Sequence, residues 1–314
     1  MTILTVTLNP AIDLATVTDK LVPHTKLRCT EPQFAVGGGG INVSRAIANL
    51  GGQSTPFAAI GGSPGQMFKS MLEAEVHQAI WFERPGITRQ NLTVLEEDSN
   101  DQYRFVFPGP TWDEALCEKA LAALGEAAGS MKYVVGSGSL PPGVPDDFYD
   151  RLGAVCDKAG ARFVLDTSGG ALAEARDATG HRPYLWIMDN AEAASLAGRP
   201  LPSMSALERF ALELREKHPA CIVVVTFSDG GAVAVSEEGL FKGRPPKVEV
   251  VSKIGAGDSF VAGLVVKLAE DWPVADAVAY AMAAAASTVS QPATALSDRE
   301  QTDRYFAMIK ENGL

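Results

Sequence analysis

The 314-residue sequence predicts an α/β fold in which a mostly parallel central sheet is flanked by helices. Short runs rich in Val and Ile, such as 133–138 and 221–228, are continuously apolar, which is typical of parallel strands buried on both faces. These runs alternate with segments of helical spacing, and βα alternation places helices on both sides of one sheet. No linker or repeat divides the chain, so we expect a single domain over residues 1–314.

The expected elements follow from length and periodicity. The short apolar runs expected to form strands are 3–8, 55–61, 133–138, 162–168, 184–190 and 221–228. The first helix is expected after the glycines at 37–40, because Val43, Ile47 and Leu50 then share one face. The later segments with helical character are 64–75, 145–159, about 257–270, 273–290 and 297–311.

Two segments interrupt this alternation. Residues 11–35 contain strand-like stretches with no helix between them, and residues 88–107 are expected to form a hairpin around the polar turn DSND. We expect both to form a small β-sheet lid inserted in the main domain, with exposed edges that favour a homodimer. The lid segments also carry a group of basic residues: Lys26, Arg28, Arg89 and Arg104.

Composition narrows the range of partners. The net charge of −11 argues against nucleic acid or an anionic membrane as a partner, and an anionic substrate would need a local basic cluster. No apolar run approaches the ~20 residues that cross a bilayer. The sequence MTILTVTLNPAIDL lacks a basic segment and a cleavage site, so we expect a first strand and a cytoplasmic protein. The cysteines are too far apart to suggest a zinc site and are expected to be reduced: Cys29, Cys117, Cys156 and Cys221.

The stretch IGAGDSFVAG, residues 254–263, carries the clearest chemical signal. Gly255, Ala256 and Gly257 precede a helical pattern, and free N–H groups at a helix start bind anions with the help of the helix dipole. Asp258 stands beside that anion site. Phosphoryl transfer requires this pairing, because donors stabilise the transferred group while a base accepts the proton of the nucleophile. The alternative is a tight turn in which Asp258 only caps the helix.

The glycine run VGGGGINVSRAIANLGG, residues 36–52, suggests a second binding element. It is neither a phosphate loop, because no Gly-Lys-Ser/Thr follows, nor a GxGxxG motif. Contiguous glycines allow a ligand to lie against the main chain. Asn42 offers a donor and an acceptor to a sugar hydroxyl, and Asp13 in NPAID adds an acceptor. Alternatively, the run is a helix start packed under a strand, and Asp13 is a turn residue.

Taken together, GGGGINVSRAIANLGG and IGAGDSFVAG, in this order and more than 200 residues apart, resemble the two signatures of the ribokinase-like PfkB carbohydrate kinases. The resemblance extends over essentially the whole chain. The segments TLNPAID, KLRCT, TRQNL, QYRFVFPG and SGSLPPG resemble the bacterial minor 6-phosphofructokinase group most, followed by 1-phosphofructokinases and tagatose-6-phosphate kinases. The latter two groups typically carry a lysine within the glycine run, where this sequence has only glycine.

The resemblance implies a ribokinase-like fold, a kinase that uses ATP and Mg²⁺, and a role for each matching residue. Asp258 would be the general base on the primary hydroxyl of the sugar. The anion hole would be formed by Gly255, Ala256 and Gly257. The residues implied to bind the sugar hydroxyls are Asp13, Gly38, Gly39 and Asn42. Those implied to bind the phosphate already on the substrate are Lys26, Arg89, Arg104 and Ser139. Those implied to contact ATP are Asn190, Thr226 and Gly231. In this family the lid closes over the sugar, which excludes water, and two lids commonly pack into a homodimer.

The nucleotide side departs from the family pattern. Where relatives carry Lys-Pro-Asn-x-x-Glu, this sequence reads Met188-Asp189-Asn190-Ala191-Glu192-Ala193. The family glutamate organises magnesium, whereas Glu192 lies one residue early, a rotation of roughly 100° on a helix. Glu192 is therefore a displaced metal candidate, and Asp189 could supply a carboxylate instead. Ser228 replaces a turn glycine, and Lys253 could offset the charge lost at Met188.

The leading hypothesis is an ATP-dependent kinase that converts fructose 6-phosphate to fructose 1,6-bisphosphate. Within the same class, 1-phosphofructokinase and tagatose-6-phosphate kinase remain open. A second class is a sugar-phosphate-binding homologue with weakened catalysis, which Met188 and Ala193 suggest. A nicotinamide-dependent oxidoreductase is disfavoured, because no strand–GxGxxG–helix unit is present near the start. The intact Asp258 in its GAGD turn favours an enzyme.

Overall fold

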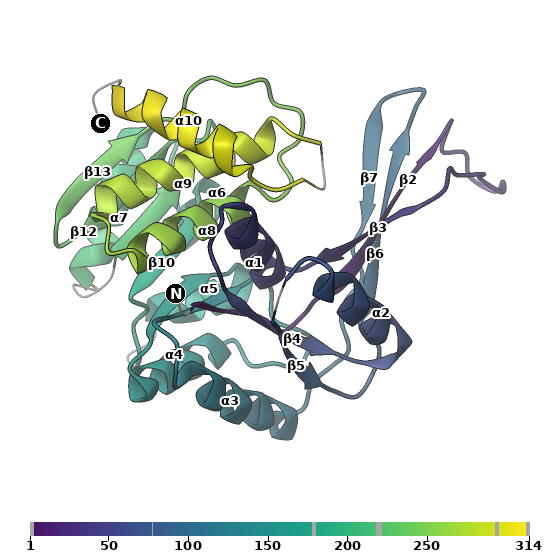
Figure 1. Ribbon diagram of the computed structural model, residues 1–314, viewed down its shortest axis with the longest axis horizontal. Coiled ribbons are helices and arrows are strands. Elements are labelled where there is room, and N and C mark those ends of the chain that lie inside the picture. The colour runs from purple at the N-terminus through teal and green to yellow at the C-terminus, as the bar shows by residue number, and fades with distance from the viewer. Residues whose placement is uncertain (1–2, 77, 178–179, 218–221, 293–294, 312–314) are drawn as a thin grey trace.

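The computed structural model describes residues 3–76, 78–177, 180–217, 222–292 and 295–311. Its main sheet contains β1 (Ile3–Thr7), β4 (Thr55–Ile60), β5 (Ile80–Glu83), β8 (Tyr133–Ser137), β9 (Arg162–Asp166), β10 (Leu185–Asp189), β11 (Ile222–Thr226), β12 (Ala232–Ser236) and β13 (Gly239–Gly243). The strand order is β13-β12-β11-β10-β9-β8-β1-β4-β5 (Figure 1). All neighbours from β11 to β5 are parallel, and β12 and β13 are antiparallel. The predicted mostly parallel sheet is confirmed.

Helices cover both faces of this sheet. One layer contains α1 (Gly39–Asn49), α8 (Ala256–Ala269), α9 (Val274–Val289) and α10 (Arg299–Glu311). The other contains α3 (Glu114–Ala128), α4 (Phe148–Ala159), α5 (Gly169–Asp177), α6 (Asn190–Ala197) and α7 (Met204–Lys217). Strand residues alternate between the layers: Leu4 and Val6 pack against the second layer and Ile3 against the first. This two-sided burial explains why the strands are apolar throughout.

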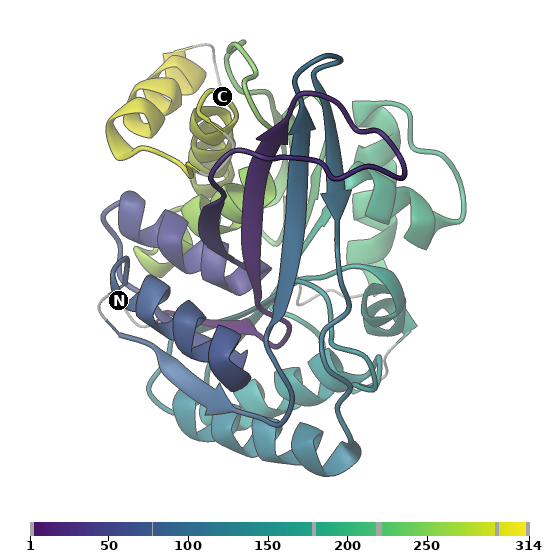
Figure 2. The same cartoon turned by 90° about the vertical axis from the view of Figure 1, so that its right-hand side faces the viewer.

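A four-stranded lid projects from the main domain, as predicted (Figures 1 and 2). It consists of β2 (Ala11–Thr18), β3 (Gln33–Gly37), β6 (Arg89–Glu96) and β7 (Asp101–Phe105), in the order β3-β2-β6-β7. β2 and β6 are parallel, and the outer pairs are antiparallel. The remaining helix, α2 (Gly62–Glu73), packs with β4 and the base of the lid in a small separate core.

The structure contains several elements that the sequence analysis did not predict. The periodicity did not single out the short strands β5, β12 and β13, nor helices α3, α5, α6 and α7. β5 and β13 lack the continuous Val/Ile run that marks the predicted strands, and the many alanines of α3 reduce the contrast in hydrophobicity between its two faces. Residues 19–32, within the first lid segment, form an irregular loop rather than strand. None of the described helices is both long and apolar enough to span a membrane.

Candidate active site

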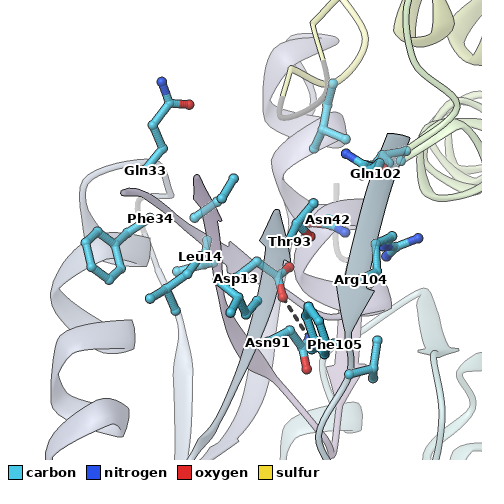
Figure 3. Close-up of a pocket in the computed structure, with 18 of the residues that line it drawn as sticks. Asp13, Leu14, Gln33, Phe34, Asn42, Asn91, Thr93, Gln102, Arg104 and Phe105 are labelled. Carbon is cyan, nitrogen blue, oxygen red and sulfur yellow. Dashed lines mark hydrogen bonds between the residues drawn. The ribbon is translucent and has the colours of Figure 1, made fainter. Parts of the chain in front are cut away.

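A cavity of about 230 Å³ lies between the lid and the first turns of α1 and α8, and we call it the lid cavity. Of the residues expected to bind a sugar phosphate or form the anion hole, those that line it are Asp13, Asn42, Arg104 and Gly255. Figure 3 shows the side chains of Asp13, Asn91, Asn42 and Arg104 gathered around the space beneath the lid strands. Residues that lie far apart in the sequence therefore meet at one polar site.

Asp13 is held by a neighbouring lid strand. It lies opposite Asn91 in the parallel β2–β6 register, and Asn91 Nδ2 donates to Asp13 Oδ1 at 2.8 Å. The Oδ1 atom of Asn91 accepts the N–H of Phe107 at 3.2 Å, which fixes the orientation of the amide. Burial raises the pKa of Asp13, while Asn91 and then the nearby guanidinium groups oppose that rise. Asp13 is therefore an oriented acceptor rather than a solvated turn residue.

Asp258 stands in the first turn of α8 and is not the helix cap. Gly255 occupies the N-cap position in a left-handed conformation (φ 76°), and no side chain caps the helix. The N–H of Ala256 donates to the carbonyl of Lys253 at a long 3.5 Å, which leaves the N–H groups of Gly257 and Asp258 available to an anion. Asn42 Nδ2 donates to Asp258 Oδ2 at 2.9 Å. Burial raises the pKa of Asp258 to about 6, and Asn42 and Arg45 partly oppose that rise. A carboxylate with this pKa is ionised at neutral pH and can accept a proton.

The space next to the glycines of residues 37–40 is filled by other atoms of the protein. A methyl group added at Gly40 would lie 2.6 Å from the carbonyl oxygen of Val6, and one at Gly38 would lie 2.6 Å from Thr7 Cγ2. Added methyl groups at Gly37 and Gly39 would overlap the side chains of Asp13 and Ser137. The run thus allows α1 to start close against β1 and β8, as the alternative interpretation proposed. By contrast, a methyl group at Gly257 would meet no described atom within 4 Å.

The basic residues of the lid divide into two groups. Arg104 lines the lid cavity, and Arg89 lies at the base of the lid, where it donates to the carbonyls of Asn9 and Phe107 at 3.2 and 3.1 Å. Lys26 and Arg28 lie in the exposed loop between β2 and β3, at the outer end of the lid and on the side away from the main sheet (Figure 1). The expected four-residue cluster is therefore not assembled within one chain, because this loop continues beyond the strands that line the cavity.

The other expected sugar-side residues lie outside the cavity lining. Ser139 is exposed in the segment that follows β8. Gly38 and Gly39 form the start of α1, next to Asn42. Their contacts with a ligand stay predictions.

A larger cavity of about 560 Å³ lies on the other side of the GAGD turn, and we call it the apolar cavity. Ala256 and Gly257 line it, whereas Gly255 lines the lid cavity, so the turn is a wall shared by the two. The apolar side chains around it are Phe227, Val248, Val250, Phe260, Met282 and Val289. The expected ATP contact Thr226 is also part of the lining, and the main chain of Gly231 is fixed next to it by the N–H of Phe227 at 2.7 Å.

Cationic side chains add charge to the apolar cavity. Arg244, Lys247 and Lys253 line it, and Arg244 is paired with Asp229 at 3.0 Å. Lys253, two residues before the GAGD turn, has no ion-pair partner among the described residues. A hydrophobic space with cations beside a helix N-terminus suits a base attached to phosphates.

Residues 188–193, which depart from the family pattern, span the end of β10 and the start of α6. Asp189 and Glu192 form a capping box at the start of α6: each side chain accepts the backbone N–H of the other residue, both at 2.8 Å. Met188 and Ala193 are buried in the core, so neither can face a phosphate or a metal. Asn190 lies between them and keeps a buried Oδ1 atom without a hydrogen-bond partner in the described structure.

Acidic groups gather near the shared wall. Burial raises the pKa of Asp166 and of Glu192 to about 7, and repulsion between carboxylates adds to both shifts. Within the described ranges, no three His, Cys, Asp or Glu side chains are arranged as direct ligands of one metal ion. Cys117 and Cys156 are buried and Cys29 is exposed, and Cys221 lies outside the described residues.

The fold and the site define a phosphotransferase of the ribokinase-like class: a partly buried carboxylate stands in the first turn of a helix that no side chain caps, next to the turn that separates a polar cavity under a lid from a larger apolar cavity. A family model described as "pfkB family carbohydrate kinase" matches residues 5–301. The chain therefore belongs to the pfkB family of carbohydrate kinases, and it resembles phosphofructokinase-2 within that family.

Individual relatives agree with this assignment. The chain is 37% identical over 307 residues to the ATP-dependent 6-phosphofructokinase isozyme 2 of Escherichia coli, with 98% of each protein covered. The crystal structure of Escherichia coli phosphofructokinase-2 in complex with fructose-6-phosphate matches with a TM-score of 0.88 at 36% identity, covering 98% of this chain and 99% of that one. Ribokinase from Arabidopsis thaliana shares the fold, with a TM-score of 0.76 at 17% identity.

Proposed function

We propose that the protein transfers the γ-phosphoryl group of ATP to fructose 6-phosphate and forms fructose 1,6-bisphosphate. The observation that carries this proposal is the position of Asp258 directly after the turn Gly255-Ala256-Gly257 that separates the two cavities, bonded to Asn42 of the lid cavity. Arg104 and Asp13 line the same lid cavity. The lid cavity offers oriented acceptors for hydroxyls and a guanidinium for a phosphate. The similarity to 6-phosphofructokinase isozyme 2 over 98% of each chain favours fructose 6-phosphate among the ketohexose phosphates.

In the proposed reaction Asp258 accepts the proton of the primary hydroxyl while the hydroxyl oxygen bonds to the γ-phosphorus and ADP departs. The free N–H groups at the start of α8 stabilise the charge on the transferred group. Asn42 holds one oxygen of Asp258, which leaves the other oxygen for the substrate. The lid covers the lid cavity and reduces the access of water, which would otherwise compete as acceptor.

Magnesium fits this site through water and phosphate rather than through a protein cage. Mg²⁺ commonly keeps several waters and takes one or two carboxylates plus substrate phosphates. Glu192 has one carboxylate oxygen outside its capping bond. Burial is the main cause of the raised pKa values of Glu192 and Asp166, and repulsion from neighbouring carboxylates, which a cation would relieve, adds to both. We propose that Glu192, with Asp166 behind it, faces the hydrated ion that accompanies ATP.

We also propose a homodimer formed through the lids. The lid carries exposed apolar side chains that a monomer would leave in water: Phe34, Tyr103, Phe105, Val106 and Phe107. β3 and β7 are its two unpaired edge strands. A tetrameric inhibited form of Escherichia coli phosphofructokinase-2 has been solved, which is consistent with self-association in this group. Sedimentation of the purified chain tests this state.

The test of function is ADP release from ATP and magnesium with fructose 6-phosphate, fructose 1-phosphate, tagatose 6-phosphate and unphosphorylated fructose in parallel. Turnover restricted to fructose 6-phosphate supports the proposal, and preference for another phosphorylated sugar replaces the substrate. No turnover, combined with a higher melting temperature in the presence of a sugar phosphate, favours the binding homologue. That second function is suggested by the burial of Met188 and Ala193, where relatives carry charged side chains.

A further inference from the structure

A series of polar side chains leads from the surface to the carboxylate of Asp258. Glu75 Oε2 accepts from Arg45 Nε at 2.5 Å, and Arg45 Nη1 donates to Asn42 Oδ1 at 3.5 Å. Asn42 Nδ2 in turn donates to Asp258 Oδ2 at 2.9 Å. Glu75 follows α2, Asn42 and Arg45 lie one turn apart on α1, and Asp258 belongs to α8. The series therefore connects three helices.

Because arginine only donates hydrogen bonds, it fixes which atom donates and which accepts along this series. A guanidinium can donate but never accept, so the atom of Asn42 that faces Arg45 must be the carbonyl oxygen. The amide nitrogen then faces Asp258, as observed. If the Asn42 amide turned over, its oxygen would stand against the carboxylate and repel it. Arg45 thus selects the one amide orientation that supports an ionised Asp258.

We propose that Arg45 is a positioning residue for phosphoryl transfer: by fixing the amide of Asn42, it keeps one oxygen of Asp258 bound and the other oxygen free for the proton of the sugar hydroxyl. This inference rests on the kinase function proposed above. Glu75 has the supporting task of holding the Arg45 guanidinium, whose side chain is 15% exposed. Arg45 also lines the lid cavity next to Asp13 and Asn42.

The charges around Asp258 agree with this role. From α1, Arg45 lowers the pKa of Asp258 and also that of Asp13. From the end of β9, Asp166 is the facing carboxylate, and Asp258 raises the pKa of Asp166. Arg45 is the cation that acts on Asp258 within the described part of the chain. Its removal leaves the base facing only a carboxylate and a mobile amide.

A purely structural role is the competing explanation, because the Arg45–Glu75 pair also ties α1 to the end of α2. The variants Arg45→Met and Arg45→Lys distinguish this structural role from the proposed positioning role. Arg151→Met is the matched control, since Arg151 joins α3 and α4 through Glu114 and Glu118 and lies outside both cavities.

In the wild type, kcat should fall as the pH drops through about 6, because Asp258 must be ionised to accept a proton. We expect Arg45→Met to lower kcat at pH 7 about tenfold, part of the roughly 10²–10⁴ that a general base contributes, and to move this acidic limb to higher pH. Arg45→Lys, which retains a donor-only cation, should restore the limb in part. Arg151→Met should lower the melting temperature without moving the limb. An unmoved limb in Arg45→Met, or an equal shift in Arg151→Met, overturns the inference.

A direct titration separates this inference from the kinase proposal. If the wild type phosphorylates none of the sugars, the titration of Asp258 is followed by carbon-13 NMR of labelled aspartate, assigned with Asp258→Asn. A higher titration midpoint in Arg45→Met then supports the action of Arg45 on Asp258 even though the proposed reaction has failed. An unchanged midpoint overturns it.

Discussion

The two cavities on either side of the GAGD turn are built in different ways. The lid cavity is small, about 230 Å³, and its polar side chains are fixed by hydrogen bonds between elements, such as Asn91 to Asp13 and Asn42 to Asp258. The apolar cavity is larger, about 560 Å³, and is formed by aliphatic and aromatic side chains, main chain and exposed cations. Side-chain identity is therefore constrained on the lid side and loosely constrained on the other.

This difference explains where the sequence departs from its family. A sugar presents hydroxyls in a fixed arrangement, and a site that hydrogen-bonds them loses much of its affinity when one partner is replaced. A nucleotide base in an apolar space tolerates changes in the surrounding side chains, and phosphates are held largely by main-chain N–H groups. This agrees with the apolar, buried side chains of Met188 and Ala193 beside an intact GAGD turn. The following experiments test this contrast.

Asp258→Asn should produce the largest effect, because Asp258 follows the turn that separates the two cavities and is the proposed base. We expect kcat to fall by about 10²–10⁴-fold through loss of the general base. The affinity for fructose 6-phosphate should be retained, since the amide keeps the size of the carboxyl group. Steady-state kinetics and calorimetric titration with the sugar phosphate measure the two quantities. Loss of binding together with turnover would contradict the role of Asp258 as a base.

Arg104→Ala tests the lid side alone. A charge-assisted hydrogen bond to phosphate is worth about 1.5–3 kcal/mol, so the KM for fructose 6-phosphate should rise roughly 10- to 100-fold. The KM for ATP should stay nearly constant. Arg28→Ala is the matched control, since Arg28 lies on the exposed lid loop outside the cavity. Equal increases in both KM values would remove Arg104 from the sugar site.

Two Gly→Ala substitutions compare a glycine next to the lid cavity with one that lines the apolar cavity. Gly40→Ala places a methyl group 2.6 Å from the Val6 carbonyl oxygen, and such overpacking should destabilise the fold by about 1–3 kcal/mol. Gly257→Ala meets no described protein atom within 4 Å, so its melting temperature should match the wild type. Its turnover should nevertheless fall, because the methyl group occupies the space of the transferred phosphoryl group. Normal ATP kinetics in Gly257→Ala would show that no ligand approaches there.

Lys253→Met tests the cation that is particular to this chain on the nucleotide side. An exposed charge contributes up to about 1 kcal/mol, so we expect a rise of roughly fivefold in the KM for ATP. The KM for the sugar phosphate should not change, and added salt should reduce the difference from the wild type. Lys242→Met provides the control, because Lys242 is paired with Glu208 outside the cavity. A sugar-specific effect would contradict this placement of Lys253.

Asp166→Asn should have the smallest effect, on stability. Burial raises the pKa of Asp166 to about 7, so the folded protein binds this proton more tightly than the unfolded chain does. Its contribution to stability is present below the ordinary value of 3.8 and is lost as the pH rises to about 7. Without magnesium, the variant should melt about 2–4 °C above the wild type at pH 8, and the gain should shrink at pH 5. Calorimetry at both pH values measures this, and a constant difference would contradict it.

The sequence predicted the fold class and one half of the site, for identifiable reasons. Parallel strands buried on both faces must be apolar throughout, so β1, β8 and β11 are visible as Val/Ile runs. An anion site at a helix start needs small residues followed by helical spacing, and this is a local pattern. Asp258 could be identified for that reason, without knowledge of what surrounds it.

The sequence did not reveal the side chains that hold the expected site residues in place. Asn91 and Arg45 carry no local signal, since an amide in a strand and an arginine on a helix are usually solvated. Asn91 matters because the parallel register sets it opposite Asp13, 78 residues away, and Arg45 because α1 and α8 pack together. The expected basic cluster does not line one cavity within a single chain for the same reason. Position in the lid segments did not reveal that the loop carrying Lys26 and Arg28 extends beyond the cavity.

The sequence by itself thus determined the βα architecture and marked the GAGD helix start with Asp258 as the candidate base, because periodicity and short-range geometry suffice for each. Only the tertiary structure decided which amide bonds to Asp258, which arginine contacts that amide, and which glycines are packed against protein atoms. Those choices depend on contacts between residues up to 216 positions apart. Sheet register and helix packing set such contacts, and no local pattern encodes them.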